Sequence, residues 1–431
     1  MLDVKLLREN PRVVKDSLKK RGMNEKDVDT FLDLDEKWRS LKQENDELRS
    51  ERNKISQQIN EARKQGKKAE DIIKRAREIP ERISKTEEEL KITGEAKNSM
   101  LESFPNIVDK SVPVGNAEKN KVVEVVGKAK KFKFQPKGHE ELLVSLDQLD
   151  MERAAKAAGA RFYYLKRDIV KMNFAIMQFA IDFLSRKGFV LMQPPYMLKK
   201  ESLNSAIPLA AFEEMIYKIE GEDLYLIGTA EHALNAYYMN ETIPAEKLPV
   251  RFAGVSPCFR KEAGSHGKDT KGIFRIHQFE KIEQFVFCRP EDSLNEFDNI
   301  LDNSREMLKQ LGIPFRFVLL SSQDMGRVPT KTIDFEGWFP SQGKYGELGS
   351  CSNCLDYQSR RANIKFEEKG ERRFVHTLNN TAIATERMIA CIAENYQRED
   401  GSIEIPKVLQ KYMRVKVIKA VKQKVQKKAK K

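Results

Sequence analysis

Several features that would place this chain in other protein classes are missing from its sequence. No apolar run approaches the roughly 18–20 residues that a membrane-spanning helix needs, and the first ten residues carry acids but no apolar signal core. The five cysteines, an odd number, are scattered over the C-terminal half of the 431 residues, so they form no disulfide framework. These absences predict a protein of the reducing cytoplasm, with no membrane partner.

The glycine patterns of two common nucleotide-binding folds are also missing. Neither a strand-linked GxGxxG nor a GxxxxGK[ST] loop occurs, which argues against a Rossmann or P-loop domain. Strand-like runs instead follow one another without regular helix alternation, which predicts an α+β fold with an antiparallel mixed sheet flanked by helices. We expect strands at 189–196, 224–228, 251–256, 280–288, 315–320, 332–339 and 372–378, and helices at 138–159, 168–187, 294–311 and 383–396.

Acidic residues are missing from the end of the chain. The net charge is +13, of which the segment 414–431 supplies +9 with no acid. A basic segment of low complexity favours a disordered tail that meets an anionic partner. We therefore expect an N-terminal domain at 1–105, a second domain at 106–413 and a free tail at 414–431.

The N-terminal part carries a coiled-coil pattern. Mostly apolar residues recur in alternating steps of four and three from Leu34 to Ala62, and again from Ile72 to Thr93, with Gly66 between the two runs. Two such helices must fold back antiparallel, giving a hairpin over about 30–101 that is roughly 45 Å long. Its tip carries the cations Arg63, Lys64, Lys67 and Lys68. The pattern alone leaves two interpretations open, a solvated spacer or dimerisation arm and a lever that binds phosphates.

Residues suited to nucleotide chemistry gather in the segment 255–286, VSPCFRKEAGSHGKDTKGIFRIHQFEKIEQFV. We expect Arg260 and Glu262 to share one strand face, and a returning strand to carry Arg275 and Phe279. The planar fork of an arginine can hold a phosphate and a carboxylate together, and a phenylalanine offers a stacking face to a base. An ordinary surface hairpin with an ion pair is the alternative for these residues taken singly.

Taken together, the residues Phe-Arg-x-Glu, a variable loop and Arg-x-x-x-Phe resemble the second signature motif of class II aminoacyl-tRNA synthetases, in the form of the seryl-tRNA synthetases. Other segments resemble that family in the same order: LMQPPY at 191–196, LIGTAEHAL at 226–234, KYGELGSCSNCLDYQSRR at 344–361 and HTLNNTAIATERMIACIAENYQREDGSIEIPKVL at 376–409. The family also carries an N-terminal helical hairpin that embraces the long variable arm of its RNA. The resemblance covers the chain to about Tyr412.

The resemblance implies an enzyme that activates serine with ATP and transfers it to the 3′ end of tRNA(Ser), and it implies the following site residues. Serine would be bound by Thr229, Ala230, Glu231, Arg260, Glu283, Asn379 and Thr381; ATP by Arg260, Lys261, Glu262, Ile276, Phe279, Glu347, Leu348, Gly349, Ser350 and Arg387; and Mg²⁺ by Glu347 and Ser350. Arg260 and Arg387 would be catalytic, and the tip cations Arg63, Lys64, Lys67 and Lys68 would bind the tRNA. A homodimer is implied through the first motif around Pro195, and DNA is not an expected partner.

Three positions depart from the family pattern. Members commonly have serine at Gly349 and a smaller residue at Asn380, and Glu386 places an unusual carboxylate beside Arg387, which it could pair with and weaken. Two other functions therefore stay open, a synthetase-like ligase that loads a carrier protein and an inactive RNA-binding paralogue. Zinc is not expected, because Cys351 and Cys354 form half a site without a second pair.

Overall fold

The protein is described by a computed structural model that covers residues 1–66, 70–262 and 272–420. The chain forms two compact units, Met1–Ile107 and Val108–Lys431. Across the described residues, no helix combines the length and apolar character needed to cross a membrane.

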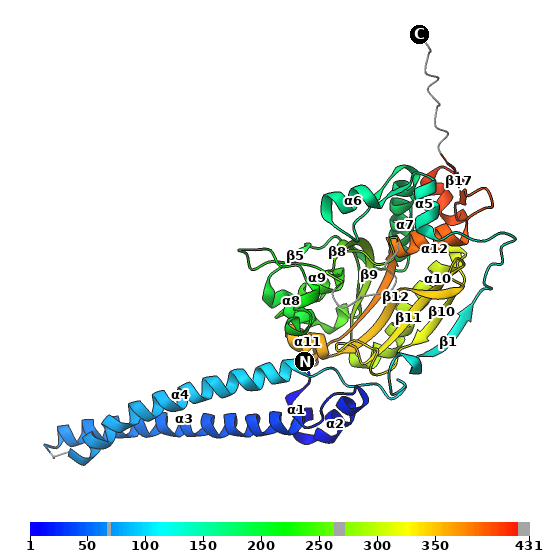
Figure 1. The fold of residues 1–431 in the computed structure, drawn as a ribbon. Helices are drawn as coiled ribbons and strands as arrows, with labels where there is room; N and C mark the ends of the chain where they lie inside the picture. Colours follow the sequence, from blue (N-terminus) through cyan, green and yellow to red (C-terminus); the bar gives the residue numbers. More distant parts are fainter. Residues whose placement is uncertain (67–69, 263–271, 421–431) are drawn as a thin grey trace, which may run out of the picture. The chain divides into compact units, whose positions relative to one another are not determined.

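The N-terminal unit is helical. It consists of α1 (Val4–Glu9), α2 (Pro11–Lys20), α3 (Asp27–Lys64) and α4 (Glu70–Ser103) (Figure 1). The two long helices pack along each other through buried apolar residues, among them Leu48, Ile55, Ile79 and Ile83. The coiled-coil hairpin expected from the sequence is confirmed. At its tip Arg63 and Lys64 are exposed in the last turn of α3, whereas the expected cations Lys67 and Lys68 lie outside the described residues.

A buried charge cluster joins α1 to the base of the hairpin. The Asp35 carboxylate is completely buried and accepts two hydrogen bonds from Arg8, at 2.7 and 2.8 Å, and one from Arg39 at 3.2 Å. The Lys97 ammonium lies 3.9 Å from the same carboxylate and 3.8 Å from the centre of the Trp38 ring. Burial alone would raise the pKa of Asp35, but the hydrogen bonds and charge of Arg8 hold that pKa below its usual value.

The C-terminal unit is built on an eight-stranded sheet in the order β1-β10-β11-β12-β15-β9-β8-β4. Its strands are β1 (Lys121–Val126), β4 (Val190–Met192), β8 (Val250–Phe259), β9 (Gln278–Cys288), β10 (Phe315–Leu319), β11 (Lys331–Phe339), β12 (Lys344–Leu355) and β15 (His376–Ala384). All neighbours run antiparallel except β4, which lies parallel to β8. The predicted mixed, mainly antiparallel sheet is confirmed.

Smaller strands and helices surround this sheet. The strands are β2 (Leu149–Asp150), β3 (Tyr164–Leu165), β5 (Met197–Leu198), β6 (Tyr225–Leu226), β7 (Thr242–Pro244), β13 (Lys365–Glu368), β14 (Glu371–Phe374), β16 (Ile403–Glu404) and β17 (Val417–Ile418). The helices are α5 (His139–Ser145), α6 (Met151–Ala158), α7 (Arg167–Arg186), α8 (Lys200–Ala206), α9 (Ala230–Ala236), α10 (Ser293–Leu311), α11 (Tyr357–Ala362), α12 (Thr385–Asn395) and α13 (Lys407–Met413). Short 3-10 turns lie at Ala117–Lys119, Leu209–Ala211, Glu213–Met215, Ala245–Lys247 and Pro290–Asp292.

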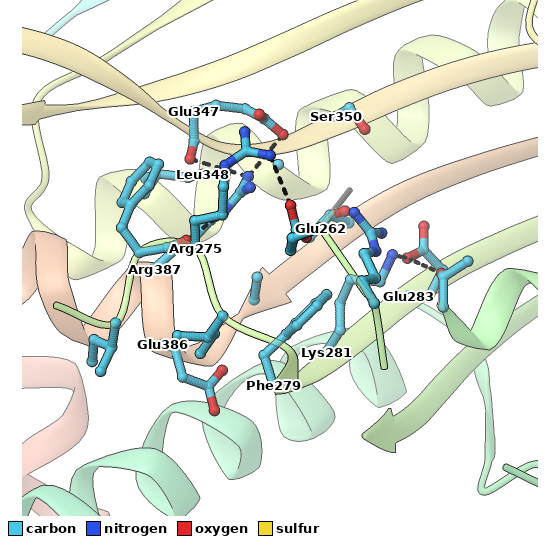
Figure 2. Close-up of a pocket in the computed structure, with 18 of the residues that line it drawn as sticks. Glu262, Arg275, Phe279, Lys281, Glu283, Glu347, Leu348, Ser350, Glu386 and Arg387 are labelled. Atoms are coloured by element: carbon cyan, nitrogen blue, oxygen red, sulfur yellow. Dashed lines mark hydrogen bonds and ion pairs between the residues drawn. The ribbon is translucent and has the colours of Figure 1, made fainter. Parts of the chain in front are cut away.

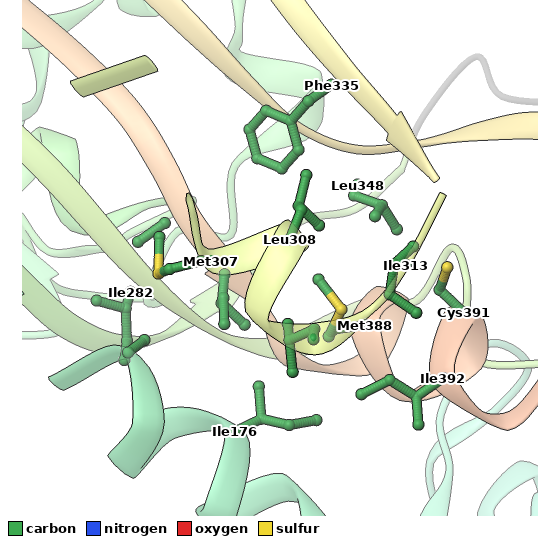
Figure 3. Packing of buried hydrophobic residues seen from close by; sticks show 14 of the residues in the cluster. Ile176, Ile282, Met307, Leu308, Ile313, Phe335, Leu348, Met388, Cys391 and Ile392 are labelled. Atoms are coloured by element: carbon green, nitrogen blue, oxygen red, sulfur yellow. The ribbon is translucent and has the colours of Figure 1, made fainter. Parts of the chain in front are cut away.

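The main core lies where α7, α10 and α12 pack on the sheet. Figure 3 shows Leu308 of α10 and Met388 of α12 meeting Leu348 of β12, with Phe335 of β11 above them and Ile176 of α7 below. These side chains are all buried. Protein interiors are close-packed, so such a core fixes the register of these strands. The same strands carry polar residues on their other face, and the positions of those residues are fixed as well.

Some sequence expectations about these elements were wrong in detail. The helix expected over 138–159 is divided into α5 and α6, because Asp147 adopts a left-handed conformation (φ 56°) and forms ion pairs with Lys166 and Arg167. The helix expected from residue 383 begins at Thr385, because β15 continues through Ala384.

Two strand expectations were also wrong in extent. The strand expected over 189–196 shrinks to the three residues of β4, since the prolines that follow cannot donate to a ladder. The run 372–378 is divided between β14 and β15.

The start of the basic tail is packed rather than free. Ile418 is completely buried, and β17 pairs with β16 at Ile403↔Ile418. The apolar residues within this basic segment explain the difference, because burying them offsets the cost of ordering the chain. Residues 421–431 lie outside the described part of the chain.

Candidate active site

Most of the residues that the sequence analysis proposed as a site line one cavity above the centre of the sheet (Figure 2). Its lining consists of Thr229, Glu231, Arg260, Glu262, Ile273, Phe274, Arg275, Ile276, Phe279, Lys281, Glu283, Glu347, Leu348, Gly349, Ser350, Asn379, Thr381, Ala384, Glu386 and Arg387. Two of the residues proposed for binding serine or ATP lie outside this lining. Ala230 is buried behind it, and Lys261 is exposed, with its ammonium 5.7 Å from the centre of the Tyr217 ring.

Arg260 and Glu262 do not share a strand face as expected. The β8–β9 pairing ends at Phe259↔Gln278, so both residues follow the strand, and Glu262 has a left-handed backbone (φ 49°). The Arg260 side chain is held by a 3.1 Å hydrogen bond from its Nε to the Gly228 carbonyl oxygen. The Glu262 carboxylate pairs with Arg275 at 2.8 Å. Tertiary contacts, rather than strand alternation, aim these two side chains at the cavity.

Phe279 provides an aromatic wall next to Arg260. The Arg260 guanidinium lies 5.3 Å from the centre of the Phe279 ring. His277 donates a hydrogen bond from its Nδ1 to the Arg260 carbonyl oxygen at 2.9 Å, so this histidine holds the backbone and does not reach the cavity lining. The arrangement leaves the ring of Phe279 and the fork of Arg260 facing the same space.

One end of the cavity is a polar pocket around Glu283. Thr229 caps the N-terminus of α9 and donates its hydroxyl to Glu283 at 3.2 Å. Glu283 also forms an ion pair with Lys281, and both side chains are almost completely buried. Thr381 lies directly opposite Glu283 on the neighbouring strand β15. Lys281 was missed by the sequence analysis, although its spacing of two from Glu283 placed both on one face of β9.

Glu231 lies in the same pocket and carries a strongly perturbed carboxyl. It accepts hydrogen bonds from Gln358 at 2.7 Å and from Asn379 at 3.1 Å. Burial and the charge of Glu283 raise the pKa of Glu231 to about 7. With a pKa near 7 this carboxyl is only partly ionised at neutral pH. A positively charged ligand beside it would favour the ionised form, so the group is suited to bind such a ligand.

The other end of the cavity carries an arginine paired with a carboxylate. Arg387, from the first turn of α12, pairs with the Glu347 carboxylate at 2.8 Å and lies 5.1 Å from the centre of the Phe274 ring. The charge of Arg387 lowers the pKa of Glu347. Ser350 follows on β12, opposite Asp334 of β11.

The donor set at this end fits a hard divalent cation. The Glu347 carboxylate and the Ser350 hydroxyl are oxygen ligands of the kind that Mg²⁺ prefers. Burial, and then the charge of Glu347, raise the pKa of Asp334 well above its usual value. This crowding of negative charge would be relieved by a bound cation.

Glu386 does not pair with Arg387, contrary to the possibility raised by the sequence. Its buried carboxyl is turned away from Arg387 (Figure 2) and accepts hydrogen bonds from the Tyr163 hydroxyl at 2.5 Å, the Glu280 amide at 3.2 Å and the Thr385 hydroxyl at 2.9 Å. Burial, and then the charge of Glu280, raise the pKa of Glu386 well above its usual value. Arg387 therefore keeps Glu347 as its carboxylate partner.

The other two departures from the family pattern are explained by packing. Asn380 is completely buried and donates to the Ser304 hydroxyl of α10 at 2.9 Å, so it points away from the cavity. A Cβ on Gly349 would lie 2.5 Å from Cζ of Phe335 and 2.7 Å from Cβ of Thr381. Only a glycine fits at position 349 beside these two neighbours.

The cysteines and histidines that the structure describes show no grouping for a metal. Within the described ranges, no cluster of three or more His, Cys, Asp or Glu residues could hold a metal ion. Cys354 instead accepts a hydrogen bond from Asn379 at 3.6 Å. His232 is buried behind the pocket, and burial lowers its pKa to about 3, so it stays neutral.

Comparisons with known proteins agree on one family. The model of the tRNA synthetase class II core domain (G, H, P, S and T) matches residues 215–396, and that of the seryl-tRNA synthetase N-terminal domain matches residues 1–108. A serine–tRNA ligase of Nitrosopumilus maritimus (strain SCM1) is 46% identical over 416 residues, covering 96% of this chain and 99% of that protein. A serine–tRNA ligase of Thermoplasma volcanium is 45% identical over 433 residues, covering 96% and 98%.

Solved structures give the same answer over both units. The crystal structure of seryl-tRNA synthetase from Pyrococcus horikoshii complexed with ATP superposes with a TM-score of 0.92 at 45% identity, covering 98% of this chain and 100% of that one. The cytoplasmic serine–tRNA ligase from Naegleria fowleri in complex with AMP gives a TM-score of 0.86 at 38% identity, covering 97% and 99%. Full-length similarity at this level, together with the cavity described above, leads to one conclusion: the chain belongs to the seryl-tRNA synthetase family of class II aminoacyl-tRNA synthetases.

Proposed function

We propose that this chain is a serine–tRNA ligase whose active site is the cavity around Arg260. The observation that carries the proposal is the division of that cavity into two ends. A buried polar pocket with Glu231 and Glu283 lies at one end, and the Arg387–Glu347 pair lies at the other, with Arg260 lining the cavity between them. Such a cavity suits an amino acid, a nucleotide base and a chain of phosphates.

In the first step a carboxylate oxygen of serine attacks the α-phosphorus of ATP. The new oxygen–phosphorus bond forms as the bond to the bridging oxygen breaks and pyrophosphate leaves with the electron pair. The serine carboxylate is already ionised at pH 7, so no general base is required. Catalysis then rests on position and charge. The guanidinium of Arg260 holds the carboxylate and the α-phosphate together, and Arg387 holds the terminal phosphate.

The polar pocket accounts for selection of serine. Glu231 takes the substrate ammonium, and Glu283, held by Lys281 and Thr229, accepts the serine hydroxyl. Alanine would leave these buried polar groups unpaired, and sites of this kind discriminate by factors of order 10⁴. Lys281 is a positioning residue here, because it acts through Glu283.

A magnesium ion and an RNA complete the reaction. Glu347 and Ser350 would hold Mg²⁺, which supplies positive charge next to the phosphates when it is bound. In the second step a terminal ribose hydroxyl of tRNA(Ser) attacks the carbonyl carbon of the seryl-adenylate, and AMP leaves. We assign RNA binding to the helical hairpin and its tip, Arg63, Lys64, Lys67 and Lys68. Replacing residues 34–101 with a short linker should leave serine activation nearly normal and remove RNA charging.

We also propose that the protein forms a homodimer through the face around Pro195. Large apolar side chains are exposed on β4 shortly before Pro195, with Val190 at 56% and Leu191 at 43%, and β4 is an edge strand. The preceding helix α7 exposes Phe174 at 64%. A monomer with such a face would be prone to association. Val190→Asp should shift sedimentation from dimer to monomer, whereas Leu294→Asp, at an exposed residue of α10, should not. A wild-type monomer would overturn this assignment.

The activity is tested by serine-dependent exchange between ATP and pyrophosphate, followed by charging of RNA. Arg260→Ala should abolish exchange in a folded protein, and wild-type exchange in this variant would contradict the role of Arg260. Absence of exchange in the wild type would favour the inactive paralogue. Exchange without RNA charging would favour a ligase that loads a carrier protein.

A further inference from the structure

A second cavity of about 390 Å³ opens beside the catalytic one. The two cavities share the lining residues Thr229, Glu231, Arg260, Glu347, Ser350 and Asn379. They therefore meet at the place where the serine carboxylate and the α-phosphate are expected to lie. A molecule in the second cavity would reach the reacting carbonyl from outside the ATP site.

The outer wall of this cavity is mainly apolar. On one side Phe212, Met215 and Ile216 come from the segment between α8 and β6, and on the other side Val328 and Pro329 come from the segment between β10 and β11. Apolar walls on two sides suit the flat faces of a base. They do not suit a small, strongly hydrated anion such as pyrophosphate.

The outer wall also carries a cationic side chain, that of Arg327. Arg327 lines the cavity and is exposed, and within the part of the chain that the structure describes its guanidinium forms no hydrogen bond or ion pair. Binding a phosphate would therefore break no existing contact. Arginine is suited to this because its fork donates two hydrogen bonds to two phosphate oxygens.

We propose that the second cavity receives the 3′-terminal nucleotide of the RNA, and that Arg327 binds the phosphate that links it to the preceding nucleotide. The base then lies between the two apolar walls, and the ribose hydroxyls reach the rim at Thr229 and Arg260, beside the carbonyl they attack. This inference rests on the proposed function, since it assigns the site of the second substrate. Arg327 was not singled out by the sequence, because it lies in an irregular segment far from the signature motifs.

The test separates activation from transfer. Arg327→Gln should leave serine-dependent ATP–pyrophosphate exchange within twofold of wild type, and it should slow single-turnover transfer from preformed seryl-adenylate by roughly 10–100-fold, the size expected for a lost charged hydrogen bond. Arg327→Lys should recover part of this loss. Arg186→Gln, at an exposed arginine near the end of α7, is the matched control and should change neither rate.

A modified RNA tests the contact itself. An RNA with an uncharged methylphosphonate at its last internucleotide linkage should be charged more slowly by the wild type. The same modification should slow transfer by Arg327→Gln little further, because this variant has already lost the contact. Additive losses would place Arg327 at another part of the RNA and overturn the proposal, and so would unchanged transfer in Arg327→Gln. An equal loss of exchange would assign Arg327 to ATP or pyrophosphate instead. Absence of exchange in the wild type would contradict the proposed function, a different outcome from any of these.

Discussion

Gly349→Ser offers a sharp test of how the packing of this active site depends on one position. The resemblance to the seryl-tRNA synthetases led us to expect serine at this position, so the change would appear conservative from the sequence. In this chain the added Cβ would lie 2.5 Å from Cζ of Phe335 and 2.7 Å from Cβ of Thr381. Carbon atoms in contact lie about 3.5–4.0 Å apart, so these neighbours would have to move by about 1 Å.

The size of the effect follows from what can move. Phe335 is a fully buried ring in the core under β11, and Thr381 is anchored in β15 opposite Glu283. Overpacking a well-filled core costs typically about 1–3 kcal/mol, which lowers the melting temperature of a large domain by roughly 2–4 °C per kcal/mol. A displacement of about 1 Å at Thr381 can also lower catalysis by up to about 100-fold. The loss should fall mainly on kcat/KM for serine.

The assays are thermal unfolding and serine-dependent exchange between ATP and pyrophosphate, measured for Gly349→Ser, Phe335→Leu and the double variant. Phe335→Leu removes the nearest atom, so the double variant should recover part of the loss, giving a coupling between the two positions. Wild-type melting together with a wild-type kcat/KM for serine in Gly349→Ser would refute the reasoning. Strictly additive effects would show that Phe335 is not the neighbour that matters.

Three further predictions concern charges. Folding raises the pKa of Glu386 well above 4.5, so the stability that this group contributes falls as the pH rises above 4.5. Glu386→Gln should therefore lose less stability than the wild type as the pH is raised from 4.5, and a difference between the two proteins that does not vary with pH would contradict this. Folding lowers the pKa of Asp35, so the stability that this group contributes is present at pH 7 and is lost as the pH falls below 3.8. Asp35→Ala should therefore cost about 3–5 kcal/mol at pH 7, because it leaves the buried Lys97 charge uncompensated. Urea unfolding followed by tryptophan fluorescence measures this cost, and the difference in stability from the wild type should shrink below pH 3.8. A chain ending at Ala420 should fold normally and lose part of its RNA affinity without losing specificity. Each phosphate contact adds roughly 0.9 to the slope of log affinity against log salt concentration, so the truncated chain should show a smaller slope than the full chain. Equal slopes for the truncated and the full chain would reject a role for 421–431.

Local patterns determined the elements that depend only on neighbours in sequence. The hairpin was predictable, because an apolar residue every three or four positions allows few other structures in water, and its buried residues Leu48 and Ile83 are those of the predicted pattern. The order of the motifs was equally informative, since it identified the family before any fold was known. The composition of the cavity followed from that resemblance.

What only the tertiary structure decided was the direction and partner of each side chain. Glu386 is adjacent to Arg387 in sequence, yet it bonds Tyr163, because the first turn of α12 sends consecutive side chains in different directions. Asp147 divides an expected helix because its ion pairs lie about twenty residues away along the chain. The space at Gly349 is set by Phe335 and Thr381 on two other strands. These are contacts between distant parts of the chain, and a local pattern carries no record of which groups folding will bring within reach.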